Sequence, residues 1–94
     1  MKKRKKTIKV LNALIVDNRP ESIIMKYDGM EHVMKTSEAQ DLYFVFRQAL
    51  TLSSPDEHKE IELDIKGIDT KLCLLRDDIY NMWIKLKHIF RITF

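Results

Sequence analysis

The sequence predicts a small, single-domain α+β protein built on a mainly antiparallel sheet, with one packed helix and a C-terminal helix or long strand. Three observations lead to this fold class. An Asp-Gly pair separates two β-prone runs, a stretch near residue 60 alternates apolar and charged side chains, and residues 37–51 repeat apolar side chains at helical spacing. The 94 residues, 45% of them hydrophobic, suffice for one domain. We expect a disordered basic arm at residues 1–6 and a single domain over residues 7–94.

The first expected element is a strand from Thr7 to Val16. Its apolar residues are rich in β-branched side chains, and the turn sequence Asp17-Asn18-Arg19-Pro20 follows it. A helix is the alternative here, since several of the apolar positions also fall on one helical face.

The clearest local signal is a β-hairpin over residues 22–34. Its Asp28-Gly29 pair suits a two-residue turn, because such turns need positive φ at the central positions. The turn sets the register, in which Tyr27 pairs with Met30, Lys26 with Glu31, Met25 with His32 and Ile24 with Val33. Lys26 and Glu31 then form a favourable cross-strand pair.

A helix is predicted over residues 37–51. Ser37 is followed by Gln40 at the spacing of a capping box, and apolar residues then recur at helical intervals as far as Leu50. The sequence Ser53-Ser54-Pro55 ends the helix. The aromatic run Tyr43–Phe46 leaves a strand open as the alternative.

Two further strands and a C-terminal element complete the expected fold. Residues 59–66 alternate apolar and charged side chains, which predicts a strand with one solvated face, and a second strand is expected at 71–76. The last segment fits both helical and strand spacing. We favour a helix over 78–89, with Asp77 as its N-cap, followed by a short strand.

The apolar sides of these elements define a candidate core. Its members are Leu14, Val16, Ile24, Val33, Leu42, Phe46, Leu50, Ile61, Leu63, Ile65, Leu72, Leu74, Met82, Leu86 and Phe90. This choice assumes that Ile24 and Val33 point inward from the hairpin.

The positive charge of the chain is concentrated near its N-terminus. Five of the 17 basic residues lie at positions 2–6, and the remaining 12 face 14 acidic residues, so a net +3 becomes −2 without the arm. The pI of about 9.0 therefore describes the arm and not the domain surface. Nucleic-acid binding is the alternative function. Its candidate phosphate contacts are Lys2, Lys3, Arg4, Lys5, Lys6, Lys85, Lys87 and Arg91.

Residue types that carry chemistry are scattered. The single cysteine, Cys73, lies in an apolar run and is interpreted as a small buried residue; this usage fits the cytoplasm. His32, His58 and His88 show no short ligand spacing with it or with one another. We expect no catalytic residue, metal, cofactor, small-molecule substrate or membrane span.

Protein–protein interaction is the predicted function, in a small non-enzymatic regulatory or adaptor module that forms a homodimer. Three methionines cluster on the hairpin, and flexible thioethers suit adaptable contact surfaces. Residues 89–94 have high β-propensity and no acid, which favours pairing with another strand or a second copy. The candidate interface residues are Met25, Tyr27, Met30, Met34, Phe90, Ile92 and Phe94.

Overall fold

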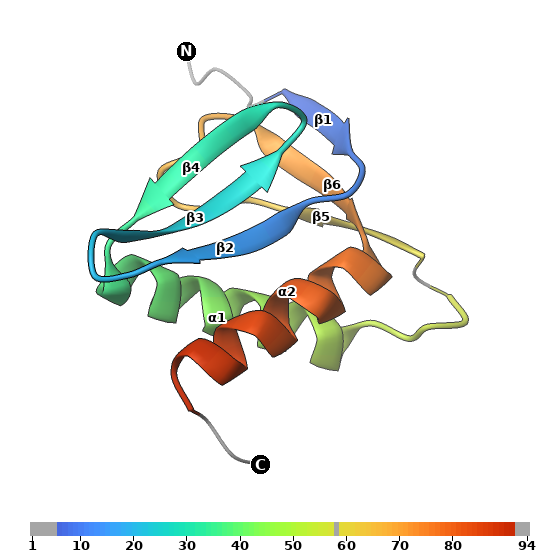
Figure 1. Cartoon of the computed structure of the whole chain (residues 1–94). Helices are drawn as coiled ribbons and strands as arrows, with labels where there is room; N and C mark the ends of the chain where they lie inside the picture. The colour runs from blue at the N-terminus through green and yellow to red at the C-terminus, as the bar shows by residue number, and fades with distance from the viewer. Residues whose placement is uncertain (1–5, 58, 92–94) are drawn as a thin grey trace.

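Two helices lie on one side of two small sheets (Figure 1). The computed structural model describes residues 6–57 and 59–91. In chain order the elements are β1 (Thr7–Val10), β2 (Leu14–Asn18), β3 (Ser22–Tyr27), β4 (Met30–Met34), α1 (Thr36–Leu52), β5 (Glu60–Leu63), β6 (Lys71–Leu75) and α2 (Arg76–Ile89). The predicted α+β class, with mainly antiparallel pairing and a C-terminal helix, is confirmed.

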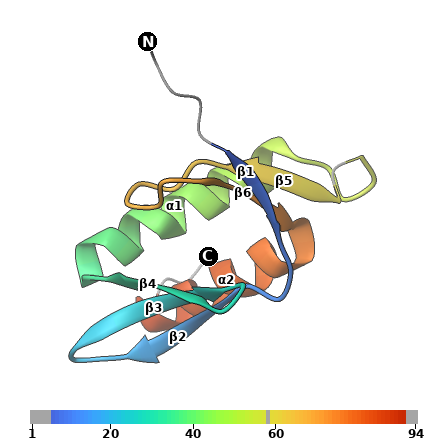
Figure 2. The ribbon, with the colours of Figure 1, turned by 90° about the horizontal axis from the view of Figure 1, so that it is seen from above.

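The strands divide between two three-stranded sheets, whereas one sheet was expected. The first has the order β1-β6-β5 and the second the order β2-β3-β4. β1 runs parallel to β6, and the other three pairs within the described residues are antiparallel. Viewed from above, the two sheets are displaced from one another, and the chain passes between them from β1 to β2 (Figure 2).

The expectation of one continuous strand from Thr7 to Val16 is wrong because the chain turns at Asn12. This residue adopts a φ of 59°, in the left-handed region that interrupts a strand and that Asn tolerates better than most residues. Its backbone N–H donates a hydrogen bond to the Asp78 carboxylate at 3.0 Å. Strands lie on both sides of the turn, so the helix alternative is excluded here.

The hairpin formed by β3 and β4 is confirmed with the expected register. Asp28 and Gly29 have φ values of 47° and 74°, the two positive values of a primed turn. Lys26 Nζ lies 3.5 Å from Glu31 Oε2 across the strands, as predicted. β2 adds to the other side of β3 by antiparallel pairing.

The face that this sheet buries is the reverse of the one expected. Ile15, Ile23 and Met25 are buried, whereas the predicted core residues Leu14, Val16, Ile24 and Val33 lie on the opposite face, partly or largely exposed. Apolar residues occupy both faces of β3, so alternation alone could not identify the inner one. The helices pack on the face that carries the longer side chains, Met25 and Tyr27.

Helix α1 confirms the helical interpretation of its aromatic run, but its cap differs. The helix begins at Thr36, and Ser37 is therefore not the N-cap. The Glu38 carboxylate accepts a hydrogen bond from the backbone N–H of Lys35 at 3.1 Å, which satisfies a donor at the helix start. Phe46 is fully buried on the inner face.

The remaining elements follow the predictions with shifted ends. β5 and β6 pair with each other, and each is shorter than expected. α2 begins at Arg76, so Asp77 lies in its first turn and is not the N-cap. Residues 78–89 are helical, which excludes the long-strand alternative for them. The expected strand after residue 89 falls mostly on residues 92–94, which lie outside the described residues.

In the last turn of each helix, a backbone carbonyl accepts a hydrogen bond from an arginine that lies outside that helix. At the end of α1, Arg76 donates from Nη2 to the Leu50 carbonyl at 3.1 Å and from Nε to Ser53 Oγ at 3.0 Å. At the end of α2, Arg19 Nη1 donates to the Ile89 carbonyl at 3.1 Å. The last carbonyls of a helix lack helical partners and carry partial negative charge, so both arginines stabilise the helix ends.

The core lies between the helix pair and the two sheets. α1 packs against α2, β3 and β4, while α2 also packs against β2 and β6. The predicted core residues that are buried are Leu42, Phe46, Ile65, Leu72, Leu74, Met82 and Leu86. Four others are partly buried and pack against this core: Leu50, Ile61, Leu63 and Phe90.

Candidate functional site

The outer face of the β2-β3-β4 sheet carries an apolar row that none of the described elements covers. Val16, Ile24 and Val33 lie directly across from one another on the three strands. Val33 is 58% exposed, and Leu14 next to this row is 46% exposed. Both helices pack on the opposite face of this sheet. We call Leu14, Val16, Ile24 and Val33 the outer sheet patch.

A charged pair borders the outer sheet patch. Leu14 pairs with Lys26, and Lys26 pairs with Glu31. The next row across the three strands therefore consists of one apolar, one basic and one acidic side chain. The Lys26–Glu31 ion pair is about half exposed on both sides and contributes little to monomer stability. Both charged groups are accessible to solvent at the edge of the patch.

The predicted methionine surface on the hairpin is largely absent. Met25 and Met34 are buried, as is Tyr27, because these side chains point toward the helices and fill the core. Met30 is 45% exposed at the hairpin turn. Phe90 packs partly against the core after the end of α2. The other two candidate interface residues, Ile92 and Phe94, lie outside the described residues.

The predicted basic contacts are only partly described. Lys2, Lys3, Arg4 and Lys5 lie outside the described residues. The backbone carbonyl of Lys6 accepts a hydrogen bond from the Lys71 N–H at 2.8 Å, so Lys6 is joined to the domain. Near the end of α2, Lys85 and Arg91 are exposed and Lys87 is half-buried.

Lys87 and Trp83 come together as a cation–π pair. The Lys87 Nζ lies 5.0 Å from the centroid of the Trp83 ring. Trp83 also stacks with Tyr43, with ring centroids 6.1 Å apart, and packs against the core. The tryptophan therefore belongs mainly to the packing between α1 and α2.

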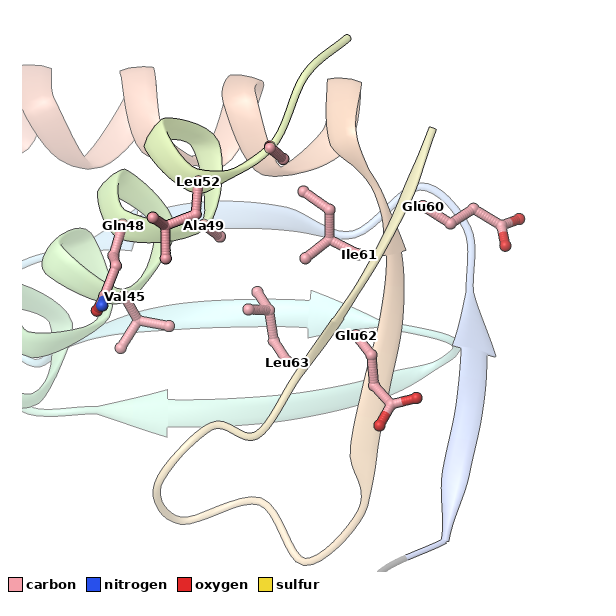
Figure 3. Close-up of a pocket in the computed structure, with 9 residues that line it drawn as sticks. Val45, Gln48, Ala49, Leu52, Glu60, Ile61, Glu62 and Leu63 are labelled. Carbon is pink, nitrogen blue, oxygen red and sulfur yellow. The ribbon is translucent and has the colours of Figure 1, made fainter. Parts of the chain in front are cut away.

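A groove of about 400 Å³ runs between α1 and β5 (Figure 3). Its walls are mostly apolar, and Ile61 and Leu63 point from β5 toward the helix, while Glu60 and Glu62 point away from it. Leu52 at its rim is 75% exposed. The lining residues are Val45, Gln48, Ala49, Leu52, Ser53, Glu60, Ile61, Glu62 and Leu63.

The two glutamates of β5 form ion pairs on the other face of their sheet. Glu60 Oε1 lies 2.8 Å from Lys9 Nζ, and Glu62 Oε1 lies 3.6 Å from Lys71 Nζ. The hydrogen bond from Lys9 lowers the pKa of Glu60, and the same bond raises the pKa of Lys9. Both residues therefore stay charged through the neutral range.

Cys73 belongs to this ion-paired face. Its Sγ lies 3.7 Å from Glu60 Oε2, which accepts its hydrogen bond. Burial raises the pKa of the Cys73 thiol, and the neighbouring Glu60 carboxylate raises it further. The thiol is therefore mostly protonated at neutral pH and is a weak nucleophile.

The polar groups of the groove do not converge on a common point. The Ser53 hydroxyl is engaged by Arg76 and the Leu50 carbonyl, and both glutamates point away from the helix. Within residues 6–57 and 59–91, no three His, Cys, Asp or Glu side chains are grouped as a metal ion requires. His58 lies outside these ranges. The arrangement suits contact with apolar side chains.

Sequence reasoning missed the groove and misassigned the outer sheet patch. The alternation of Ile61 with two glutamates predicted a strand with one solvated face, but no feature of the sequence predicted that α1 would lie beside this strand. Neither described helix is long and apolar enough to cross a membrane. No protein-family model, curated protein or solved structure matches the chain.

Proposed function

We propose that this chain is a small non-enzymatic regulatory or adaptor module that forms a homodimer through its outer sheet patch. The observation that carries the proposal is the apolar row of Val16, Ile24 and Val33 on a sheet face that none of the described elements covers. Contiguous apolar side chains on a sheet face commonly mark a contact with another protein. The single cysteine is in keeping with action in the cytoplasm.

A second copy suits this face because the face is complementary to itself. In a two-fold arrangement the apolar rows stack on each other, as the inner faces of two packed sheets do. Lys26 and Glu31 lie side by side at the edge of the row, so Lys26 of one copy can approach Glu31 of the other. Full burial of an exposed valine is worth about 1.5–3 kcal/mol, so burying the 58% of Val33 that is exposed contributes about 1–2 kcal/mol.

Sedimentation equilibrium of the full chain and of Val33→Lys tests the proposal. The wild-type chain should dimerise with rising concentration, and Val33→Lys should weaken the association at least tenfold, because it places two charges in a dry interface. Lysine is well tolerated on an exposed edge strand such as β4, so the variant should remain folded.

Leu52→Lys is the matched control. Like Val33, Leu52 is an exposed apolar residue, with 75% of its surface accessible. It lies at the end of α1 and outside the outer sheet patch. It should leave dimerisation unchanged. A wild-type chain that stays monomeric at all concentrations, or equal weakening by both variants, contradicts this proposal.

Nucleic-acid binding is the second candidate, favoured by the cations Lys85, Lys87 and Arg91 near the end of α2. Lys87 is engaged with Trp83, and Lys85 lies close enough to Asp17 to contribute to lowering the pKa of that carboxyl. These local partners reduce the charge available for phosphates. A salt titration of binding to labelled DNA and RNA, with and without residues 2–5, decides this candidate.

A further inference from the structure

β5 is an edge strand whose outward main-chain groups have no strand partner among residues 6–57 and 59–91. It pairs with β6 on one side and is the last strand in the order β1-β6-β5. The Lys59 carbonyl accepts a hydrogen bond from the Arg76 N–H at 2.8 Å, so residue 59 faces β6. Antiparallel pairing alternates, so the N–H and C=O groups of Glu60 and Glu62 face away from β6.

The groove beside this edge is shaped for the side chains of an added strand. A strand next to β5 places alternate side chains on the same face as Ile61 and Leu63, which point toward α1 (Figure 3). There they meet the apolar groove of about 400 Å³, to which α1 contributes Val45, Ala49 and Leu52. The groove therefore favours apolar residues at these alternate positions.

The intervening side chains of an added strand fall on the face of Glu60 and Glu62. These are the only charged side chains that line the groove among the described residues. The surrounding segment, residues 55–64, holds five acidic residues and one lysine. Both glutamates have lysine partners, but each remains partly exposed, at 38% and 52%. Basic residues are favoured at these positions.

We propose that the edge of β5 binds an extended segment of another protein, in which apolar residues alternate with lysine or arginine, as a fourth strand of this sheet. Main-chain hydrogen bonds to residues 60 and 62 provide affinity, and the groove against α1 selects the apolar side chains. Pairing of β5 with β5 of a second copy is disfavoured, because it brings glutamates of both strands together. This site is separate from the outer sheet patch.

The test uses a fluorescein-labelled synthetic peptide in which valine and leucine alternate with lysine and arginine. Its anisotropy is followed as the full-length protein is added, against a control peptide of the same composition in which the apolar and the basic residues form two blocks. The alternating peptide should bind more tightly than the control, because only it presents its two kinds of side chain to opposite faces.

Two variants of one residue separate main-chain pairing from charge. Glu62→Pro removes an outward N–H at an edge position where proline is tolerated, whereas Glu62→Ala removes only the carboxylate. We expect about a twofold loss of peptide affinity for Glu62→Ala, as for an exposed charge. Glu62→Pro should lose about tenfold, since it also removes a main-chain hydrogen bond and blocks close approach.

Ala49→Trp fills the groove from the helix and should abolish peptide binding. Gln40→Trp, at an exposed position of α1 that does not line the groove, should leave it unchanged. Circular dichroism of each variant confirms folding.

Equal binding of both peptides, or binding that survives Ala49→Trp, overturns the proposal. The proposal is also overturned if Ala49→Trp abolishes self-association of the chain, because the groove is then an interface between copies. Val33→Lys should leave peptide binding unchanged, which separates this test from that of the homodimer.

Discussion

Ile23 and Ile24 are neighbours in β3 that point to opposite faces, so changing each to alanine tests which face is buried. Ile23 has no exposed surface, whereas Ile24 lies partly exposed on the outer sheet patch. The two substitutions delete the same atoms from the same strand. Any loss of intrinsic strand propensity is therefore common to both, and the difference reports burial.

The structure sets the expected magnitudes. Truncating a fully buried isoleucine to alanine costs about 2–5 kcal/mol, so we expect a loss of about 3 kcal/mol for Ile23→Ala. Ile24→Ala should cost less, about 1.5 kcal/mol in the dilute chain, because part of the Ile24 side chain is already in water. At about 4–8 °C per kcal/mol for a domain of this size, only Ile23→Ala should lower Tm by more than about 12 °C.

Urea unfolding followed by the fluorescence of Trp83, the single tryptophan, measures both variants. Repeating the urea titration at higher protein concentration shows whether each loss of stability depends on self-association. The loss from Ile23→Ala should stay constant, whereas that from Ile24→Ala should grow with protein concentration if the proposed homodimer forms. Equal losses in the dilute chain, or a larger loss for Ile24→Ala, would refute the assignment of the inner face.

Two further predictions concern a buried hydroxyl and a helix cap, and a third concerns an exposed ion pair. Tyr43→Phe should raise the free energy of unfolding by about 1 kcal/mol in urea titrations, because the Tyr43 hydroxyl is buried without a hydrogen-bond partner in the described chain; a loss of stability contradicts this. Arg76→Met should lower the free energy of unfolding by about 2 kcal/mol, since its charged donors cap the end of α1; a change below about 0.5 kcal/mol would show that water replaces the cap. The Arg19 side-chain hydrogen bonds lower the pKa of Asp17, so its stabilisation is complete above the ordinary carboxyl range and declines as pH falls through the lowered pKa. Asp17→Asn should therefore flatten the fall of the urea midpoint between neutral and acidic pH, and an unchanged profile argues against the ion pair.

Elements whose signals are local were predictable from the sequence. The Asp28-Gly29 pair fixed both the turn and the register of the hairpin, because positive φ at two successive residues suits few other pairs. The apolar periodicity of α1 was stronger than the β-propensity of its aromatic run, and Phe46 is buried as expected. These features depend on residues close together in the chain.

Features that depend on distant residues were missed. At the turn, the backbone N–H of Asn12 donates a hydrogen bond to the carboxylate of Asp78, 66 positions away, and a single Asn within an apolar run is a weak turn signal. The inner face of β3 could not be chosen because Ile23, Ile24 and Met25 are consecutive apolar residues. This error concealed the outer sheet patch, since its residues were placed in the core.

The groove could not be predicted for a related reason. Its two walls, α1 and β5, are joined by a loop but belong to different layers, and only the packing shows that they face each other. The charged side of β5 was correctly interpreted as solvated. Its apolar side was expected to be covered, but Ile61 and Leu63 remain partly exposed beside the groove.

The mass of the full chain in solution tests the central claim most directly. Sedimentation equilibrium of the wild-type chain, beside Val33→Lys, should show a concentration-dependent rise from 11.2 kDa toward twice that value, which the substitution suppresses. A wild-type mass that stays at 11.2 kDa throughout, or a dimer that persists unchanged in Val33→Lys, would contradict the assignment of the outer sheet patch as the contact between two copies.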